Sequence, residues 1–130
     1  MFSTNYTIPQ PIAWSNRNSL TNVDRTKPLT LSWTGGDGGQ TVAIIGFGVD
    51  MPSNSSAVFT CIAPRGSSSF TVPTDILSNI PATRPNPLQS KDVIYLMTLA
   101  GSSQQDLGAS GLDVGFTSFY SIIGKTVVYQ

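Results

Sequence analysis

The chain has 130 residues, with seven basic and seven acidic side chains, one cysteine and no histidine, and only 11% of its residues are charged. This composition argues against nucleic-acid binding, which needs clustered Lys and Arg, and against catalysis or metal binding by histidine. A lone cysteine also excludes an intrachain disulfide, and the length fits a single domain over residues 1–130.

The N-terminal segment, residues 1–19, is predicted to be irregular. Ile12 and Trp14 stand two apart, so they predict one short edge strand within it. Residues 20–23 form a second, weaker strand candidate. The first residues lack the basic flank and apolar core of a signal peptide. We therefore expect that an export signal, if the protein is exported, lies outside this chain.

The most regular stretch is residues 28–49, PLTLSWTGGDGGQTVAIIGFGV. Leu29, Leu31 and Trp33 alternate with hydroxyl residues, which predicts a strand with one buried face. The run from residue 42 to residue 49 is apolar and β-branched enough for the centre of a sheet. The glycines between the two runs tolerate positive φ. They predict an antiparallel hairpin.

Residues 57–63 alternate again, with Phe59 and Cys61 on one face. A turn at residues 64–68 is expected to bring residues 69–72 back as a partner strand, with Phe70 and Val72 pointing inward. The next residues break the β pattern. Over residues 74–80 the spacing of the apolar side chains predicts a short helix with Thr74 as its N-cap.

Residues 82–92 contain two prolines and are expected to form a crossing loop. Residues 93–100 predict a central strand, and residues 101–111 a long loop or a short hairpin with an edge strand. A long strand over residues 112–122, bent at Gly115, is expected to follow. Gly124 would then open a last turn into residues 126–130.

This succession of seven to nine short strands predicts an all-β fold. The expected architecture is an antiparallel two-sheet β-sandwich of immunoglobulin-like topology with one short helix near residues 74–80. A closed barrel is the main alternative. No run of about eighteen apolar residues predicts a transmembrane segment.

A domain that recurs in acidobacterial proteins resembles this chain in the segments PLTLSWTGG, VAIIGFG, FTCIAPRGSSSFTVPTDILSNIP and SGLDVGFTSFYSIIGKTVVYQ. That domain typically stands at the C-terminal end of larger secreted or surface proteins and has no assigned activity. The resemblance covers roughly residues 14–130. It implies an immunoglobulin-like accessory module, and it defines no functional residues. The antibody pattern of two bridged cysteines around a tryptophan is absent.

Two aromatic residues are the candidate binding residues. Trp14 lies in the irregular N-terminal segment and is the best candidate for an exposed platform that stacks on sugar rings. Tyr120 is adjacent to Phe119 on an expected strand, so one of the two must point outward. Trp33 shares a face with two leucines and is predicted to lie in the core.

The remaining chemistry-bearing residues predict ordinary structural roles. Cys61 has no histidine to activate it and is predicted to be a small core residue. Asp37, Asp106 and Asp113 could offer oxygen ligands to calcium, but no calcium-loop pattern surrounds them, and turn roles are favoured. We expect no catalytic residue, no bound metal and no cofactor.

These observations predict a non-catalytic structural or adhesive module of a larger secreted or cell-surface bacterial protein. Its expected partners are other domains of the same polypeptide or extracellular molecules. A carbohydrate-binding module that uses Trp14 and Tyr120 on a polysaccharide is the alternative, and an enzyme is the least favoured interpretation.

Overall fold

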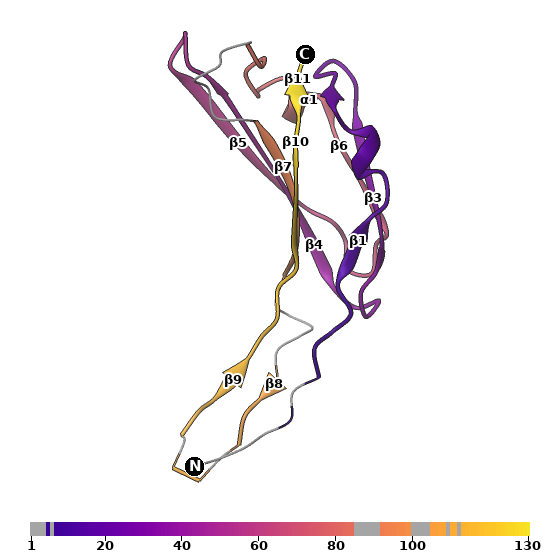
Figure 1. Cartoon of the computed structure of the whole chain (residues 1–130), viewed down its shortest axis with the longest axis vertical. Coiled ribbons are helices and arrows are strands. Elements are labelled where there is room, and N and C mark those ends of the chain that lie inside the picture. Colours follow the sequence, from indigo (N-terminus) through magenta and orange to yellow (C-terminus); the bar gives the residue numbers. More distant parts are fainter. Residues whose placement is uncertain (1–4, 6, 85–91, 100–104, 109, 112) are drawn as a thin grey trace.

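The computed structural model describes residues 5, 7–84, 92–99, 105–108, 110–111 and 113–130. Two antiparallel sheets dominate this part of the chain (Figure 1). The first sheet has the order β1-β3-β6, and the second has the order β10-β7-β4-β5. Their bounds are β1 Ile12–Trp14, β3 Leu29–Gly35, β6 Ser69–Val72, β10 Ile122–Thr126, β7 Val93–Leu99, β4 Thr41–Asp50 and β5 Ser55–Ile62.

The strand order is that of an immunoglobulin-like sandwich, which confirms the predicted fold class. In immunoglobulin lettering, β1, β3 and β6 take the places of strands A, B and E, and β4, β5, β7 and β10 those of C, C′, F and G. A parallel pair of β2 (Asn22–Val23) with β11 (Val128–Tyr129) joins the segment after β1 to the chain end after β10. Neither main sheet closes into a barrel.

The core lies between the two sheets and follows from their alternation. Leu31 and Trp33 on β3, Ile44 on β4 and Leu96 on β7 all point inward and are almost fully buried. Phe59 on β5 packs over Gly46, its partner across the strand pair. The expected inward positions of Leu31, Trp33, Phe59 and Val72 are confirmed.

The predicted hairpin over residues 28–49 is wrong. Both edges of β3 are paired, one with β1 and the other with β6, while β4 pairs with β5 and β7. The glycine-rich connection therefore crosses from one sheet to the other. Gly35, Gly36 and Gly38 do adopt positive φ, as expected. A turn of this kind reverses the chain without requiring that the two strands share hydrogen bonds.

Two further strand predictions need correction. Residues 69–72 form β6, but they pair with β3 and not with residues 57–63. The single long strand expected over residues 112–122 is wrong: β9 (Phe116–Thr117) pairs with β8 (Gln105–Asp106), and β10 begins only at Ile122. Residue 112 itself lies outside the described residues. Gly124, expected in a turn, lies inside β10 opposite Tyr95.

The expected short helix is present as α1 (Thr74–Leu77) and, together with Ile80, closes one end of the core. Thr74 is not its N-cap, because Pro73 occupies that position without a side-chain hydrogen bond and Thr74 is the first helical residue. A 3-10 turn, η1 (Arg17–Ser19), was not predicted. The candidate edge strand around Ile12 and Trp14 is confirmed as β1 at one edge of its sheet.

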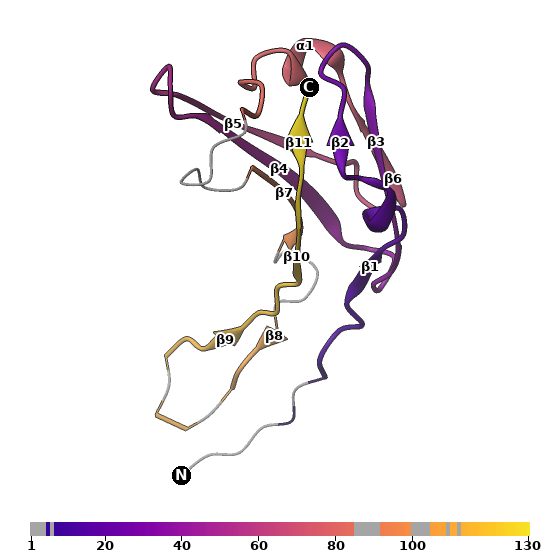
Figure 2. The ribbon, with the colours of Figure 1, turned by 45° about the horizontal axis from the view of Figure 1, so that its top comes forward.

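At the other end of the sandwich, the β8–β9 hairpin projects away from both sheets (Figure 2). We call residues 105–121, as far as they are described, the arm. Among the described residues, no helix is long and apolar enough to cross a membrane.

Candidate functional site

The four-stranded sheet carries the largest exposed group of apolar side chains on its solvent side, which we call the outer face. The outer face consists of the outward positions of β4, β5, β7 and β10. Val58 is 65% exposed, Ile122 61%, Ile62 59% and Tyr95 39%. Ile45, Tyr95, Met97 and Ile122 line a shallow hollow of about 230 Å³ on this face.

The register of the strands places these side chains side by side. Met97 stands opposite Ile122 on β10, and Ile45 on β4 stands between Tyr95 and Thr60. The ring of Tyr95 lies across Gly124, where a Cβ would come within 2.8 Å of its Cε1 atom. An aromatic ring that covers a cross-strand glycine in this way shields the backbone of the neighbouring strand, as in the aromatic rescue of glycines in sheets.

The outer face, all four strands of which are described, carries no charged side chain. Besides the residues of the hollow, its outward positions are Thr41, Ala43, Phe47, Val49, Ser56, Val58, Thr60, Ile62, Val93, Leu99, Gly124 and Thr126. A monomeric domain usually places charged or polar residues on the solvent side of an antiparallel sheet. This face departs from that pattern and has the composition of a buried surface.

Sequence reasoning missed the outer face, although the signal was present. The apolar runs of β4 and β7 are nearly continuous, as is typical of strands with both faces covered. The interpretation of residues 42–49 as the centre of a sheet is confirmed, because β4 pairs with β5 on one edge and with β7 on the other, but it did not address what covers the outer side. The alternation in β3, by contrast, matches a strand with one wet face, and Thr30 and Thr34 are indeed exposed there.

The expectation that Trp14 forms an exposed platform is wrong. Trp14 is 7% exposed, and its indole Nε1 donates a hydrogen bond of 2.9 Å to Oδ1 of Asn16. Its position in β1, directly opposite Trp33 on β3, turns the side chain into the core. The segment looked irregular because β1 is only three residues long.

Tyr120 is 53% exposed and lies on the arm, apart from the buried Trp14. Phe116, four residues earlier, is 61% exposed. The hydroxyl of Ser118 donates a weak hydrogen bond to the phenol oxygen of Tyr120 at 3.5 Å. The two predicted binding residues therefore do not share a surface, and Tyr120 has Phe116 as its exposed aromatic neighbour in sequence.

Cys61 lies where the alternation placed it, on the inward side of β5 at the margin of the core. Its side chain is only partly buried, and burial raises the pKa of the thiol. Because the thiolate is the reactive form, a raised pKa lowers the reactivity of this cysteine at neutral pH.

The loop aspartates show no metal-site geometry. Asp37 Oδ1 accepts the backbone N–H of Gly39 at 3.0 Å, the usual role of an aspartate in a turn. Asp106 and Asp113 are exposed on the arm. Among the described residues, no three acidic or cysteine side chains are grouped in a way that could hold a metal ion.

A buried aspartate, Asp92, was also missed because it lies at the end of the expected crossing loop. Only 1% of Asp92 is exposed. Its Oδ1 accepts the N–H of Val49 at 2.9 Å, and its Oδ2 accepts the hydroxyl of Thr83. Thr83 Oγ1 in turn accepts the N–H of Tyr129 at 2.8 Å. This network ties the start of β7 to β4 and β11, which is a structural role.

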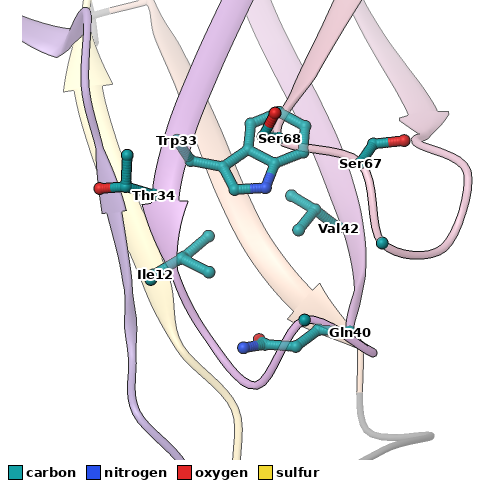
Figure 3. A pocket seen from close by; sticks show the side chains of 10 residues that line it. Ile12, Trp33, Thr34, Gln40, Val42, Ser67 and Ser68 are labelled. Carbon is teal, nitrogen blue, oxygen red and sulfur yellow. The ribbon is translucent and has the colours of Figure 1, made fainter.

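A pocket of about 370 Å³ opens at the end of the sandwich between the β3–β4 connection and the turn before β6. Figure 3 shows Ile12, Trp33 and Val42 around it, with Gln40 at its rim. None of the described residues that line it is charged. The Nε2 atom of Gln40 is buried without a hydrogen-bond partner in the described part of the chain, but it packs against Gly36 and is closed to solvent. Its polar side chains are those of Thr34, Gln40, Ser67 and Ser68, so the pocket offers hydroxyl and amide groups to a ligand, but no charge.

Comparisons with known proteins do not identify a relative. The chain matches no family model, no curated protein and no solved structure. The resemblance to the acidobacterial domain therefore stays an expectation, and the function has to be argued from the geometry of the chain.

Proposed function

We propose that this chain is a non-catalytic structural or adhesive module of a larger secreted or cell-surface bacterial protein. The observation that carries the proposal is the outer face of the four-stranded sheet, which is apolar, uncharged and open to solvent. Exposed apolar patches of this kind mark contact surfaces, because their burial is favourable by roughly 25 cal/mol per Å².

The chemistry of the outer face favours a protein partner over a sugar. A saccharide needs several hydrogen-bonding groups around an aromatic ring, whereas most outward side chains here are aliphatic. Among the described residues that line the hollow, Tyr95 alone is aromatic. An aliphatic surface suits a second apolar protein surface, where packing and desolvation supply the free energy.

The properties of the only cysteine also support a non-catalytic role. The raised pKa of the Cys61 thiol keeps it protonated at neutral pH, and the chain contains no histidine that could act as its base. The low charge and the many hydroxyl residues support an extracellular location, as does the resemblance to domains of secreted proteins.

Oxidative footprinting of methionines tests the proposal even when the partner is unidentified. Met97 lines the hollow of the outer face, whereas Met51 is 54% exposed at the tip between β4 and β5. We expect hydroxyl radicals to oxidise Met97 less in the assembled full-length protein than in the dilute isolated chain, with Met51 as the internal control. Equal oxidation of Met97 in both samples would contradict the proposal.

Carbohydrate binding is the second candidate function, and the arm is what favours it. Phe116 and Tyr120 are both more than half exposed, and aromatic rings stack on the C–H faces of sugars. Affinity electrophoresis in polysaccharide gels tests this candidate. A retarded wild-type chain and an unretarded Tyr120→Ala chain would support it, and equal mobility with and without polysaccharide would exclude the sugars tested.

A further inference from the structure

We propose that the partner of the outer face is a second copy of this chain, bound face to face about a twofold axis. This inference rests on the proposed function, because it assigns the occupant of the same surface. It makes the module homophilic: two protomers would bury their four-stranded sheets against each other, and the three-stranded sheets would face outward.

The amphipathic character of the two sheets shows which surface is incomplete. The outer side of the three-stranded sheet is coated with polar groups, for example the hydroxyls of Thr30 and Thr71, which are 2.8 Å apart. The four-stranded sheet is apolar on both sides. Sheets with two apolar faces are normally covered on both. The inner side is covered by the core, whereas Val58, Ile62 and Ile122 on the outer side are mostly exposed.

The absence of charge favours a copy of the same chain over a charged partner. A twofold interface brings each patch onto itself, so any charge near the axis meets a like charge. The four described strands of the outer face hold no outward charge, so self-contact creates neither repulsion nor a buried unpaired ion. The outer face also offers nothing that would select a partner by charge.

The size of the outer face fits a modest dimer interface. The seven residues of β7 span roughly 23 Å, and four strands about 4.8 Å apart span roughly 19 Å. The footprint is then on the order of 440 Å² in projection, and interdigitating side chains bury more than their projection. Standard interfaces bury about 800 Å² per partner, so the sheet alone supplies a large part of that area.

The arm carries further exposed apolar side chains. Val114 is 82% exposed, and Phe116, Tyr120 and Ile122 are each more than half exposed. Phe116 lies in β9, and Ile122 begins β10 and is also part of the outer face. Residues 114–122 cover roughly 30 Å when extended. The arm therefore carries exposed apolar side chains beyond the edge of the sheet, which a twofold partner could also contact.

Sedimentation velocity of the whole 130-residue chain tests the inference. We expect a dimer with a dissociation constant below about 0.1 mM. This constant should change little between about 0.05 and 0.5 M salt, because no ion pairs form across the interface. Val58→Lys and Ile122→Lys should each weaken the dimer at least tenfold. Both side chains are mostly exposed in the monomer, so these variants should fold.

A matched control lies on the other sheet. Ala13 is exposed on the outer side of β1, and Ala13→Lys should leave the dimer unchanged. Cysteine placed on the outer face gives a second readout. Thr60→Cys should form an intermolecular disulfide under mild oxidation, whereas Ala13→Cys should not. A chain that stays monomeric and shows no Thr60→Cys cross-link would overturn the homodimer.

The two proposals fail in different ways. If the chain is monomeric but Met97 is protected in the assembled full-length protein, the outer face binds another partner and only the homodimer is wrong. If Met97 is not protected and no dimer forms, the outer face is not a contact surface, and both proposals are wrong. A dimer that survives both lysine substitutions would place the contact elsewhere and would also overturn the inference.

Discussion

Tyr129 shows how a single buried polar atom can set the pH dependence of stability. The side chain is fully buried, and its hydroxyl has no hydrogen-bond partner among the described residues. Burial, with a smaller contribution from the negative charge of Asp92, raises the pKa of the phenol far above its ordinary value of 10.0. The folded protein therefore keeps Tyr129 protonated under conditions in which the unfolded chain loses the proton.

We expect Tyr129→Phe to increase the free energy of unfolding by about 1 kcal/mol at pH 7, because it removes an unpaired buried hydroxyl. The sign of the pH effect follows from the raised pKa. The wild-type stability is fully present below pH 10 and falls by about 1.4 kcal/mol per pH unit above it, and Tyr129→Phe should lack this share of the slope. Urea titrations from about pH 7 to pH 11 measure both effects. A destabilised Tyr129→Phe chain would show that the hydroxyl has a partner.

Gly46 is a position where the absence of a side chain allows a buried aromatic ring to pack. A Cβ at this position would lie 2.1 Å from Cε1 of Phe59, the buried aromatic residue directly opposite on β5. Gly46→Ala should therefore displace the ring and lower the free energy of unfolding by about 1–3 kcal/mol. Gly108→Ala is the control, because nothing lies within 4 Å of its Cβ.

Urea denaturation measures this effect, and a second substitution confirms its cause. Phe59→Leu alone should lower the free energy of unfolding. The double variant with Gly46→Ala should lose less than the sum of the two single losses, because the smaller leucine side chain leaves room for the new methyl group. Additive losses would show that the ring of Phe59 does not limit position 46.

The strands themselves could be predicted well from the sequence, and their pairing could not. Alternation in residues 29–33 and 57–63 identified the inward residues, because a period of two depends only on local geometry. Which strands pair depends on the whole fold, because a strand can pair only with another strand whose edge is not already occupied. The glycine-rich connection after β3 is equally compatible with a hairpin and with a crossing between sheets, so the sequence pattern favoured the wrong one.

The candidate site was missed for a related reason. Apolar residues on both sides of β4 and β7 predict burial, but a sequence does not show which side its own chain covers. The prediction for Trp14 was wrong because a strand of three residues gives too short a pattern to show which of its side chains face the core. For Phe119 and Tyr120 the alternation predicted only that one of the two points outward, and Tyr120 is the more exposed of the pair.

The connection between β3 and β4 can be tested through two of its glycines. Both have positive φ, which costs about 1–2 kcal/mol for a residue with a Cβ. At Gly38 nothing lies within 4 Å of the added atom, whereas at Gly35 it would be 2.7 Å from the carbonyl oxygen of Pro11. We expect Gly38→Ala to lower the free energy of unfolding by about 1 kcal/mol, and Gly35→Ala by at least about 3 kcal/mol.

Chemical denaturation of the two variants under identical conditions measures this difference. The difference between the two losses arises from the contact of position 35 with Pro11, which precedes β1. It therefore reports on the packing of β1 against the end of β3. Equal losses for both substitutions would mean that the segment before β1 does not pack against Gly35.

The C-terminal residues 127–130 connect the two sheets of the whole molecule. Val127 and Tyr129 are buried, and β11 pairs with β2, which follows β1 of the three-stranded sheet in sequence. The carbonyl oxygen of Gln130 accepts the backbone N–H of Arg25 at 3.0 Å. The last residues therefore close the sandwich along one side, and their removal opens the core to water.

Truncation after Thr126 should remove one buried aromatic and one buried aliphatic side chain, a loss of about 5 kcal/mol or more. The free energy of unfolding of a whole domain is only about 5–15 kcal/mol, so we expect the truncated chain to be largely unfolded at about 25 °C. Trp14 and Trp33 report on the three-stranded sheet through their fluorescence, and far-UV circular dichroism reports on both sheets. Both signals should be lost together, because the sheets share one core. Native tryptophan emission in the truncated chain would instead mean that the three-stranded sheet is stable without the β2–β11 pair, and that the C-terminal residues do not hold the sandwich together.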